Sequence, residues 1–232
     1  MKAIITLNNE KWQVPEEITV GQFSQVASLG LEDLKARRLI CAIILDAPLQ
    51  TFNQVEDEEL EGVFQICMAS MISMNEPRPY DGLVDFDQMT FGQFVDLDSL
   101  SHMGLNDNLV ECISIIWEHD TDQIWSTPMA RYWRGIEQWL EKRKAIYKAY
   151  ETFFEIVEDV EPSEDSNASD TADIRRAWYQ AIVTLAGEDF MKIHEVVERP
   201  LTEALNYLSY LKDQAFKRQQ AQRHRLAQMK HR

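Results

Sequence analysis

The chain has 232 residues, of which 45% are hydrophobic, so it can build a hydrophobic core as one large domain or two small ones. No apolar run approaches the roughly 20 residues that cross a bilayer, and the N-terminus lacks the charged-then-apolar order of a secretory signal. We therefore expect a soluble protein made in the cytoplasm, with no membrane partner. The formal net charge of −16 disfavours binding to nucleic acid over most of the surface.

The first elements in chain order form a predicted β-hairpin followed by helices. Short β-prone runs at 2–7 and 11–14 are separated by Asn8-Asn9-Glu10, which is typical of a hairpin. Helices are predicted at about 20–29 and 34–45 from the three-and-four spacing of apolar residues. A third is predicted at about 57–74, with an acidic first turn and burial on most sides. A hairpin that leads into a helix also resembles the opening of the ubiquitin-like β-grasp.

One phrase occurs twice and starts a helix each time. Thr19-Val20-Gly21-Gln22-Phe23 and Thr90-Phe91-Gly92-Gln93-Phe94 each place Thr at the N-cap and Gln at N3. These positions form a capping box, in which each side chain bonds to the other residue's backbone amide. With an offset of 71 residues, Val26 aligns with Leu97 and Cys41 with Cys112. The turn at 30–33 finds its counterpart at 104–107, displaced by a three-residue insertion. The sequence therefore predicts a duplicated module.

The region between the two phrases and just after the second holds polar candidates for a site. A turn at 76–82 stops the preceding helix, and a short strand is predicted at 83–86. Four carboxylates, at 85, 87, 96 and 98, lack the ligand order and glycine turn of an EF-hand, so we expect them to cap helices and face water. We expect His102 to have a surface or capping role.

The C-terminal half is predicted to be helical. Thr127 at N-cap and Pro128 at N1 predict a long helix to about 159 with a broad aromatic stripe, which favours core or protein-interface packing over stacking with a base. Residues 158–170 are acidic and polar and predict a mobile linker. A helix beginning at Asp170 or Thr171, a short one at 188–197, and a last one opened by Pro200 follow. The last helix loses its apolar face after Phe216, so we expect it to project.

No motif for chemistry is present. Cys41, Cys67 and Cys112 lie singly among apolar neighbours, which predicts buried reduced thiols. The sequence has no Gly-rich phosphate loop, GxSxG or HExxH. We expect no enzyme activity, no cofactor and no metal, with a buried acid-base pair in a cleft as the open alternative.

Charge is distributed unevenly along the chain. Residues 211–232 hold seven Lys or Arg and one acid, whereas the first 210 hold 16 basic and 38 acidic residues. A basic tail can seek an acidic protein surface, including that of another copy, or phosphate, so binding to nucleic acid remains an alternative for this segment alone. A solvated helix end favoured by its own dipole is the other alternative.

Two stretches carry a family resemblance. The order Trp178-Tyr179-Gln180-Ala181-Ile182, then Leu185-Ala186, Asp189-Phe190, Ile193, Val196-Val197 and the run 200–208, resembles the C-terminal helical segment of small tailed-bacteriophage proteins encoded among tail and connector genes. The run Thr90–Leu97 resembles a phrase in crAss-like and related phages. The resemblance implies a non-enzymatic role in virion assembly, either as a subunit of the portal, tail connector or tail, or as a tail assembly chaperone that is not retained in the virion. It implies no site residues.

The sequence as a whole predicts a mainly α (α+β) protein with an N-terminal hairpin, a duplicated module and a projecting C-terminal helix. The expected segments are a first module at 1–75, a related module at 76–126, a long aromatic helix at 127–158, an acidic linker at 159–170 and a helical region with a basic end at 171–232. We expect a homo-oligomer or a complex with other phage structural or tail proteins, made in the host cytoplasm and located in the virion. An enzyme or a nucleic-acid-binding regulator is the alternative class. The candidate partner-binding residues are Trp133, Trp139, Tyr150, Tyr207, Leu211, Lys217, Arg218, Arg223 and Arg225.

Overall fold

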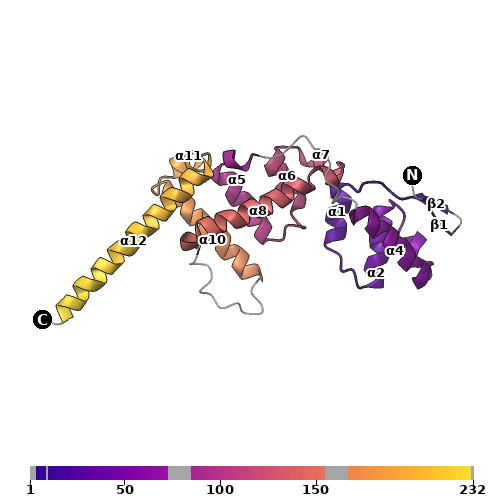
Figure 1. Cartoon of the computed structure of the whole chain (residues 1–232), viewed down its shortest axis with the longest axis horizontal. Helices are drawn as coiled ribbons and strands as arrows, with labels where there is room; N and C mark the ends of the chain where they lie inside the picture. The colour runs from indigo at the N-terminus through magenta and orange to yellow at the C-terminus, as the bar shows by residue number, and fades with distance from the viewer. Residues whose placement is uncertain (1–3, 9, 73–84, 155–166, 231–232) are drawn as a thin grey trace. The chain divides into compact units, whose positions relative to one another are not determined.

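A computed structural model describes residues 4–8, 10–72, 85–154 and 167–230 (Figure 1). The chain is mainly helical with a small two-stranded antiparallel sheet at the N-terminus, which confirms the predicted fold class. It divides into two compact units, which are described separately below. Unit 1 comprises Met1–Val84 and Met103–Gln138, and unit 2 comprises Asp85–His102 and Trp139–Arg232. Within the described ranges, no helix combines the length and apolarity that a membrane span requires.

Unit 1 begins with the predicted hairpin. Strand β1 (Ile4–Leu7) pairs antiparallel with β2 (Glu10–Gln13). Asn8 turns the chain with φ of 49°, a left-handed conformation that Asn tolerates better than most residues. Ile5 and Leu7 point into the core because alternate side chains of a strand face opposite sides.

The rest of unit 1 is helical. Helices α1, α6 and α7 contact one another around a shared apolar centre, and α2 contacts both α1 and α4. The helices of unit 1 are α1 (Val20–Ala27), α2 (Leu34–Ile44), α3 (Gln50–Asn53), α4 (Asp57–Ile72), α6 (Leu109–Trp117), α7 (Thr121–Trp125) and the 3-10 turn η3 (Met129–Arg131), followed by the start of α8 (Trp133–Ala149).

Helix α4 is buried along one face only, so the prediction that it is buried on most sides is wrong. Its buried side carries Leu60, Val63, Phe64 and Cys67. Its opposite side exposes Glu58, Glu59, Gly62, Gln65, Ile66 and Ala69. The prediction failed because it counted Ile66 as core, whereas that side chain is 43% exposed.

Unit 2 is built around α5 (Phe91–His102), which contacts three other helices of the unit. These are α10 (Asn167–Leu185), α11 (Ile193–Val197) and α12 (Leu201–Lys230). The unit also contains the remainder of α8, the short helix α9 (Glu151–Phe154) and the 3-10 turns η2 (Phe86–Gln88) and η4 (Phe190–Lys192). Figure 1 shows α12 leaving α10 and α11 and continuing as one long helix to the C-terminus.

Both predicted capping boxes are present. The Thr19 hydroxyl accepts from the Gln22 amide at 3.1 Å, and the Thr19 amide donates to Gln22 Oε1 at 2.9 Å. The corresponding distances for Thr90 and Gln93 are 3.2 and 3.0 Å. Each box satisfies two backbone donors at the start of its helix, which explains why α1 and α5 begin directly after their Thr residues.

Each box also takes part in a long-range backbone contact, which we call the proline bridge. In unit 1, Thr19 forms an antiparallel bridge with Pro128, and in unit 2 Thr90 forms one with Pro200. In unit 1 the Val20 amide donates to the Thr127 carbonyl and the Met129 amide to the Ile18 carbonyl, both at 2.9 Å. In unit 2 the equivalent bonds, 71 or 72 residues later, measure 2.8 and 3.1 Å. The repeated phrase therefore marks a repeated tertiary contact as well as a helix start.

The helices that pack against the two repeated helices, α1 and α5, are not all those that the sequence comparison predicted. Helix α6, which contains Cys112 and was aligned with α2, contacts α1 within unit 1. The helix that contacts α5 in unit 2 is α10. Residues 103–126, which the sequence grouped with the second phrase, accordingly lie in unit 1.

The long helix predicted from 128 to 159 is interrupted. Pro128 is extended, with ψ of 130°, because it forms the proline bridge, and α8 begins only at Trp133. Helix α8 ends at Ala149 and α9 follows at Glu151. The sequence pattern of Thr followed by Pro therefore marked a tertiary contact rather than a helix N-terminus.

Two other predictions fall partly outside the described residues. The predicted strand at 83–86 includes residues 83 and 84, which are not described, and Phe86 begins the turn η2. The predicted linker lies mostly at 155–166, which is also not described. Helix α10 begins at Asn167 rather than at Asp170 or Thr171, so the end of the predicted linker is helical.

Candidate functional site

The aromatic residues predicted to bind a partner occupy different environments. Trp139 is fully buried in unit 2, where its Nε1 donates to Ser101 Oγ at 3.1 Å. Its predicted role in a partner contact is therefore wrong, because the ring is part of the core. Trp133 is half-buried in unit 1, 5.6 Å from the Phe23 ring centre. Tyr150 is half-buried in unit 2, where its hydroxyl donates to Asn206 Oδ1 at 3.0 Å.

The remaining predicted residues lie on α12. Tyr207 is 52% exposed and Leu211 is half-buried. Lys217, Arg218 and Arg223 are exposed. The side chain of Arg225 lies outside the described residues. The structure therefore places six of the nine predicted residues on one helix.

The distal part of α12, residues 212–230, has the strongest features of an interaction site. Its proximal part is anchored in unit 2 by Leu201, Ala204, Leu205 and Leu208, all buried. From Asp213 to His224, every side chain except the half-buried Gln214 is exposed, and none of residues 212–224 forms a side-chain hydrogen bond or ion pair within the described part of the chain. Most helical stability in proteins comes from tertiary packing, so contact with another surface would stabilise this uncovered part of the helix.

The two units carry equal negative charge. Unit 1 contains 19 acidic and 8 basic residues, and unit 2 without residues 212–232 contains the same numbers, so each has a net charge of −11. Residues 212–232 contain seven basic residues and one acid. The distal part of α12 is therefore positively charged, whereas both units are negatively charged. This favours contact between the distal part of α12 and an acidic protein surface such as that of either unit.

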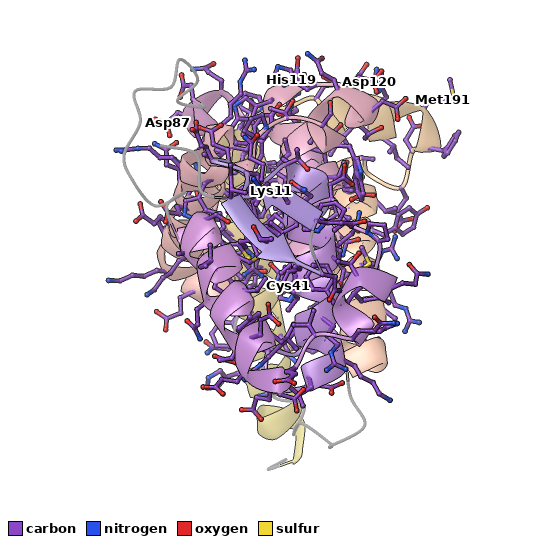
Figure 2. All side chains as sticks on the ribbon, turned by 90° about the vertical axis from the view of Figure 1, so that its right-hand side faces the viewer. Lys11, Cys41, Asp87, His119, Asp120 and Met191 are labelled. Carbon is purple, nitrogen blue, oxygen red and sulfur yellow. The ribbon has the colours of Figure 1, made fainter. Side chains whose placement is uncertain are left out.

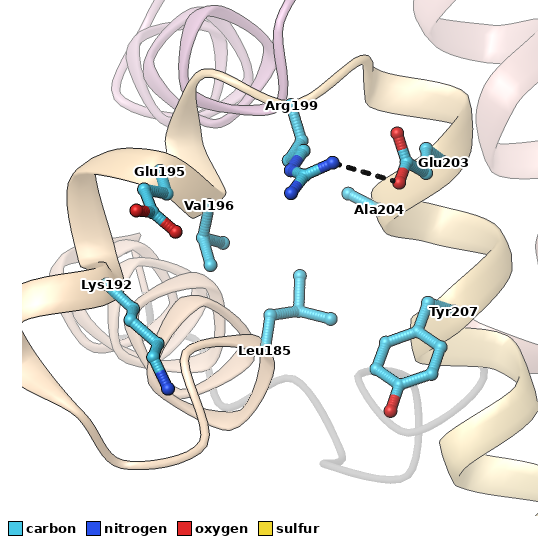
Figure 3. A pocket seen from close by; sticks show the side chains of 8 residues that line it. All are labelled: Leu185, Lys192, Glu195, Val196, Arg199, Glu203, Ala204 and Tyr207. Atoms are coloured by element: carbon cyan, nitrogen blue, oxygen red, sulfur yellow. Dashed lines mark hydrogen bonds and ion pairs between the residues drawn. The ribbon is translucent and has the colours of Figure 1, made fainter.

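A pocket of about 260 Å³ lies at the base of α12 (Figure 3). Its apolar walls come from Leu185, Val196, Ala204 and Tyr207. Most charged residues of the rim form ion pairs with residues close to them in the sequence. Arg199 lies 3.5 Å from Glu203, and Lys192 lies 3.4 Å from Asp189. The volume is below the roughly 300 to 1,000 Å³ of pockets that enclose a drug-sized ligand. The hollow is of a size to accept a side chain of a partner protein.

Two large apolar side chains of unit 2 are strongly exposed. Phe190 is 80% exposed and Met191 is 81% exposed, both on η4. Figure 2 shows the Met191 side chain pointing away from the ribbon. Exposed apolar residues are common on protein surfaces, so this pair by itself does not define an interaction site.

The main cluster of titratable groups in the described residues surrounds Asp98 in unit 2. Asp98 is fully buried, which corrects the prediction that it faces water. Its carboxylate accepts from Arg143 Nε at 2.7 Å, from Trp178 Nε1 at 2.8 Å and from the Tyr147 hydroxyl at 3.0 Å. These bonds join α5 to α8 and α10. A buried carboxylate whose oxygens are all engaged acts as a structural link, because no substrate can reach it.

His102 lies at the edge of this cluster, where the residue is exposed and its ring is partly covered. Its Nε2 accepts from Arg143 Nη2 at 2.6 Å, which requires the neutral imidazole. Burial lowers the pKa of His102, and the Arg143 guanidinium lowers it further, while the Asp98 carboxylate opposes both. The exposure of His102 agrees with its predicted surface role, and the bond to Arg143 shows that it also joins the Asp98 cluster.

The lowered pKa of His102 predicts a pH dependence of stability. The unfolded chain, with a His pKa of about 6.5, binds this proton more readily than the folded chain, so unit 2 should lose stability as the pH falls below about 6.5. Thermal unfolding at pH 5.5 and 7.5 measures this difference. A His102→Gln variant, whose amide oxygen can still accept from Arg143, should show a smaller difference. Equal differences in the two proteins would contradict the assignment.

The cysteines have no reactive environment. All three are free and buried, as predicted. A hydrogen bond with Cys67 and burial raise the pKa of Cys41, and burial raises the pKa of Cys112 to about 12. Thiols held in the protonated form are poor nucleophiles and poor metal ligands.

The distal part of α12 is the candidate site that the geometry supports best. Within the described residues, no group of three or more His, Cys, Asp or Glu side chains is placed to hold a metal ion.

No protein-family model, curated protein or solved structure matches this chain. The sequence indicated α12 through its change from apolar to basic composition and allowed core packing for the aromatic stripe that contains Trp139, but gave no sign that Asp98 is a core residue.

Proposed function

We propose that this chain is a non-enzymatic assembly protein that acts through protein–protein contacts made by the distal part of α12. The observation that carries this proposal is the contrast along one helix, whose first part is buried in unit 2 and whose exposed second part is basic. In line with the sequence resemblance, we propose a subunit of the portal, tail connector or tail of a tailed bacteriophage, made in the host and retained in the virion. The partners are further copies of this chain or other acidic structural proteins of the particle.

The mass of the protein in solution tests this proposal. Light scattering should show an oligomer for the full chain and a smaller species for a chain that ends at Leu211, because the truncation removes the exposed basic segment and leaves the buried anchor of α12. Circular dichroism serves as the control that the truncated chain still folds. Raising the salt concentration should weaken the oligomer, since the Debye length falls from about 10 Å at 0.1 M to about 3 Å at 1 M.

The outcome separates two roles in assembly. An oligomer that depends on residues 212–232 supports a structural subunit. A monomer from both chains contradicts self-assembly and moves the proposal to a tail assembly chaperone, whose acidic client would have to be added. Salt-dependent DNA binding that is lost on truncation would instead support the nucleic-acid alternative.

A further inference from the structure

The exposed face of α4 in unit 1 has the form of a seat for another helix. Along it lie Glu59, Gly62, Ile66 and Ala69, spaced by three and four residues on one side of the helix. Acidic side chains occupy the N-terminal end of this face, and apolar or small ones occupy the rest except for the exposed Gln65. We call these residues, together with Glu58, the α4 face.

The glycine at position 62 of the α4 face is not explained by contacts within unit 1. It lies in the middle of α4 with ordinary helical geometry, where glycine weakens a helix relative to alanine. A Cβ at this position would meet no atom within 4 Å. Nothing in the described part of unit 1 therefore requires glycine here. A second helix that approaches closely would require it, because a missing side chain lets two backbones come together.

The distal part of α12 carries a matching stripe. Leu201, Leu205 and Leu208 are buried on one face of α12. With the same spacing of three and four residues, this face continues through positions 212, 216, 219 and 223. On this continuation, Phe216 is 58% exposed and Arg223 is exposed. The face that is buried near the start of α12 thus runs uncovered along its distal part.

The two faces match when their helices run antiparallel. Phe216 and Arg223 are seven residues apart, as are Ile66 and Glu59 in the opposite direction. Placing Phe216 on Ile66 therefore puts Arg223 beside Glu59 and the backbone of Gln219 and Gln220 over Gly62. The acidic first turn of α4 then meets the basic end of α12, and the two helix dipoles are opposed, so both charge terms are favourable.

We propose that the distal part of α12 of one copy docks antiparallel on the α4 face of a second copy. The second copy is the occupant because unit 1 supplies a net charge of −11 together with a helix of matching pattern. The donor surface and the acceptor surface are different, so the contact is heterologous and builds a ring or an open chain of copies. This inference rests on the proposed function and names its partner.

A bulky residue at Gly62 tests the seat. Gly62→Leu should lower the association constant of the full chain by at least about tenfold, since the side chain would separate the helices. The same variant should keep or raise the thermal midpoint of the monomer, because leucine favours a helix more than glycine does. Ala172→Leu, at an exposed helical position of unit 2, is the matched control and should leave association unchanged.

A charge exchange tests the register. Glu59→Lys and Arg223→Glu should each weaken association by about threefold or more, and the chain carrying both should recover it, because an ion pair of opposite polarity replaces the original one. Glu198→Lys, an exposed acid of unit 2, matches the charge change of Glu59→Lys and should not show rescue by Arg223→Glu.

The outcomes distinguish this inference from the proposed function. Loss of association with Gly62→Leu and recovery in the charge exchange support docking on α4. An oligomer that is lost on truncation after Leu211 but unaffected by Gly62→Leu overturns the α4 seat and leaves assembly through α12 standing. A full chain that stays monomeric at all concentrations overturns both the seat and self-assembly.

Discussion

Replacing Asp98 with alanine is expected to destabilise unit 2 by about 3 to 5 kcal/mol, the cost of breaking a buried ion pair by removing one partner. The carboxylate is fully buried, whereas the Arg143 side chain opposite it is 24% exposed. The variant would leave Arg143 without its partner and Trp178 Nε1 without the acceptor that lies 2.8 Å away. An unsatisfied buried donor costs about 1 to 3 kcal/mol by itself.

The position of Asp98 makes this effect local. Its three donors come from α8 and α10, so the one side chain ties two helices to α5. The same helices are joined by aromatic contacts, since Phe94 lies 5.6 Å from the Trp178 ring centre and 5.7 Å from that of Trp139. We therefore expect α5, α8 and α10 to loosen together while the hairpin and α4 of unit 1 keep their structure.

Hydrogen exchange measured by mass spectrometry checks this prediction, because it resolves the two units where a single unfolding midpoint would average them. Peptides from α5 and α10 should exchange faster in Asp98→Ala, and peptides from α4 should not. Asp173→Ala, at a 68% exposed aspartate of the same unit, is the control and should change stability by less than about 0.5 kcal/mol. Unchanged exchange in α5 and α10 would show that the cluster is not a structural link.

The elements that the sequence predicted best are those fixed by local interactions. Each capping box depends on two residues three positions apart, and the hairpin on a short turn, so both can be inferred from neighbouring residues. The thiol environments also followed from their apolar neighbours. The basic end of α12 could be located because charge composition needs no tertiary structure.

The predictions that failed depended on partners far apart in the sequence. Pro128 has the pattern of a helix start, but its contact with Thr19, over a hundred residues away, holds it extended. By sequence alone, Asp98 looks like the nearby exposed aspartates at 85, 87 and 96. It is a core residue only because other helices cover it. Trp139 could not be distinguished from Trp133 by spacing, yet one is buried and the other half-buried.

Gly135 in α8 is a second position whose role lies outside its own helix. A Cβ at Gly135 would lie 2.2 Å from one atom of the Trp117 ring and 2.3 Å from another. The ring also packs edge-on against Tyr132, whose ring centre lies 4.9 Å away. Gly135→Ala therefore forces a rigid ring to move, and overpacking of this kind costs about 1 to 3 kcal/mol.

This cost opposes a gain that is independent of the contact. Alanine stabilises a helix interior by about 1 kcal/mol relative to glycine. Because the clash lies far inside van der Waals contact and involves an indole with no flexible end, we expect the steric cost to prevail. After the helix-propensity gain is subtracted, Gly135→Ala should destabilise unit 1 by about 1 kcal/mol. Gly62→Ala, also within a helix of unit 1 but with no atom near its Cβ, should stabilise it by about 1 kcal/mol.

The two alanine variants are compared by urea unfolding, monitored by hydrogen exchange in peptides of unit 1. The same substitution is expected to lower the stability at one position and to raise it at the other. A double variant that adds Trp117→Leu separates the clash from other effects. If the clash is the cause, Gly135→Ala should cost less in the Trp117→Leu background than in the wild type, with a coupling of about 1 kcal/mol or more. Stabilisation by Gly135→Ala, or an equal cost in both backgrounds, would show that the Trp117 ring does not set the requirement for glycine.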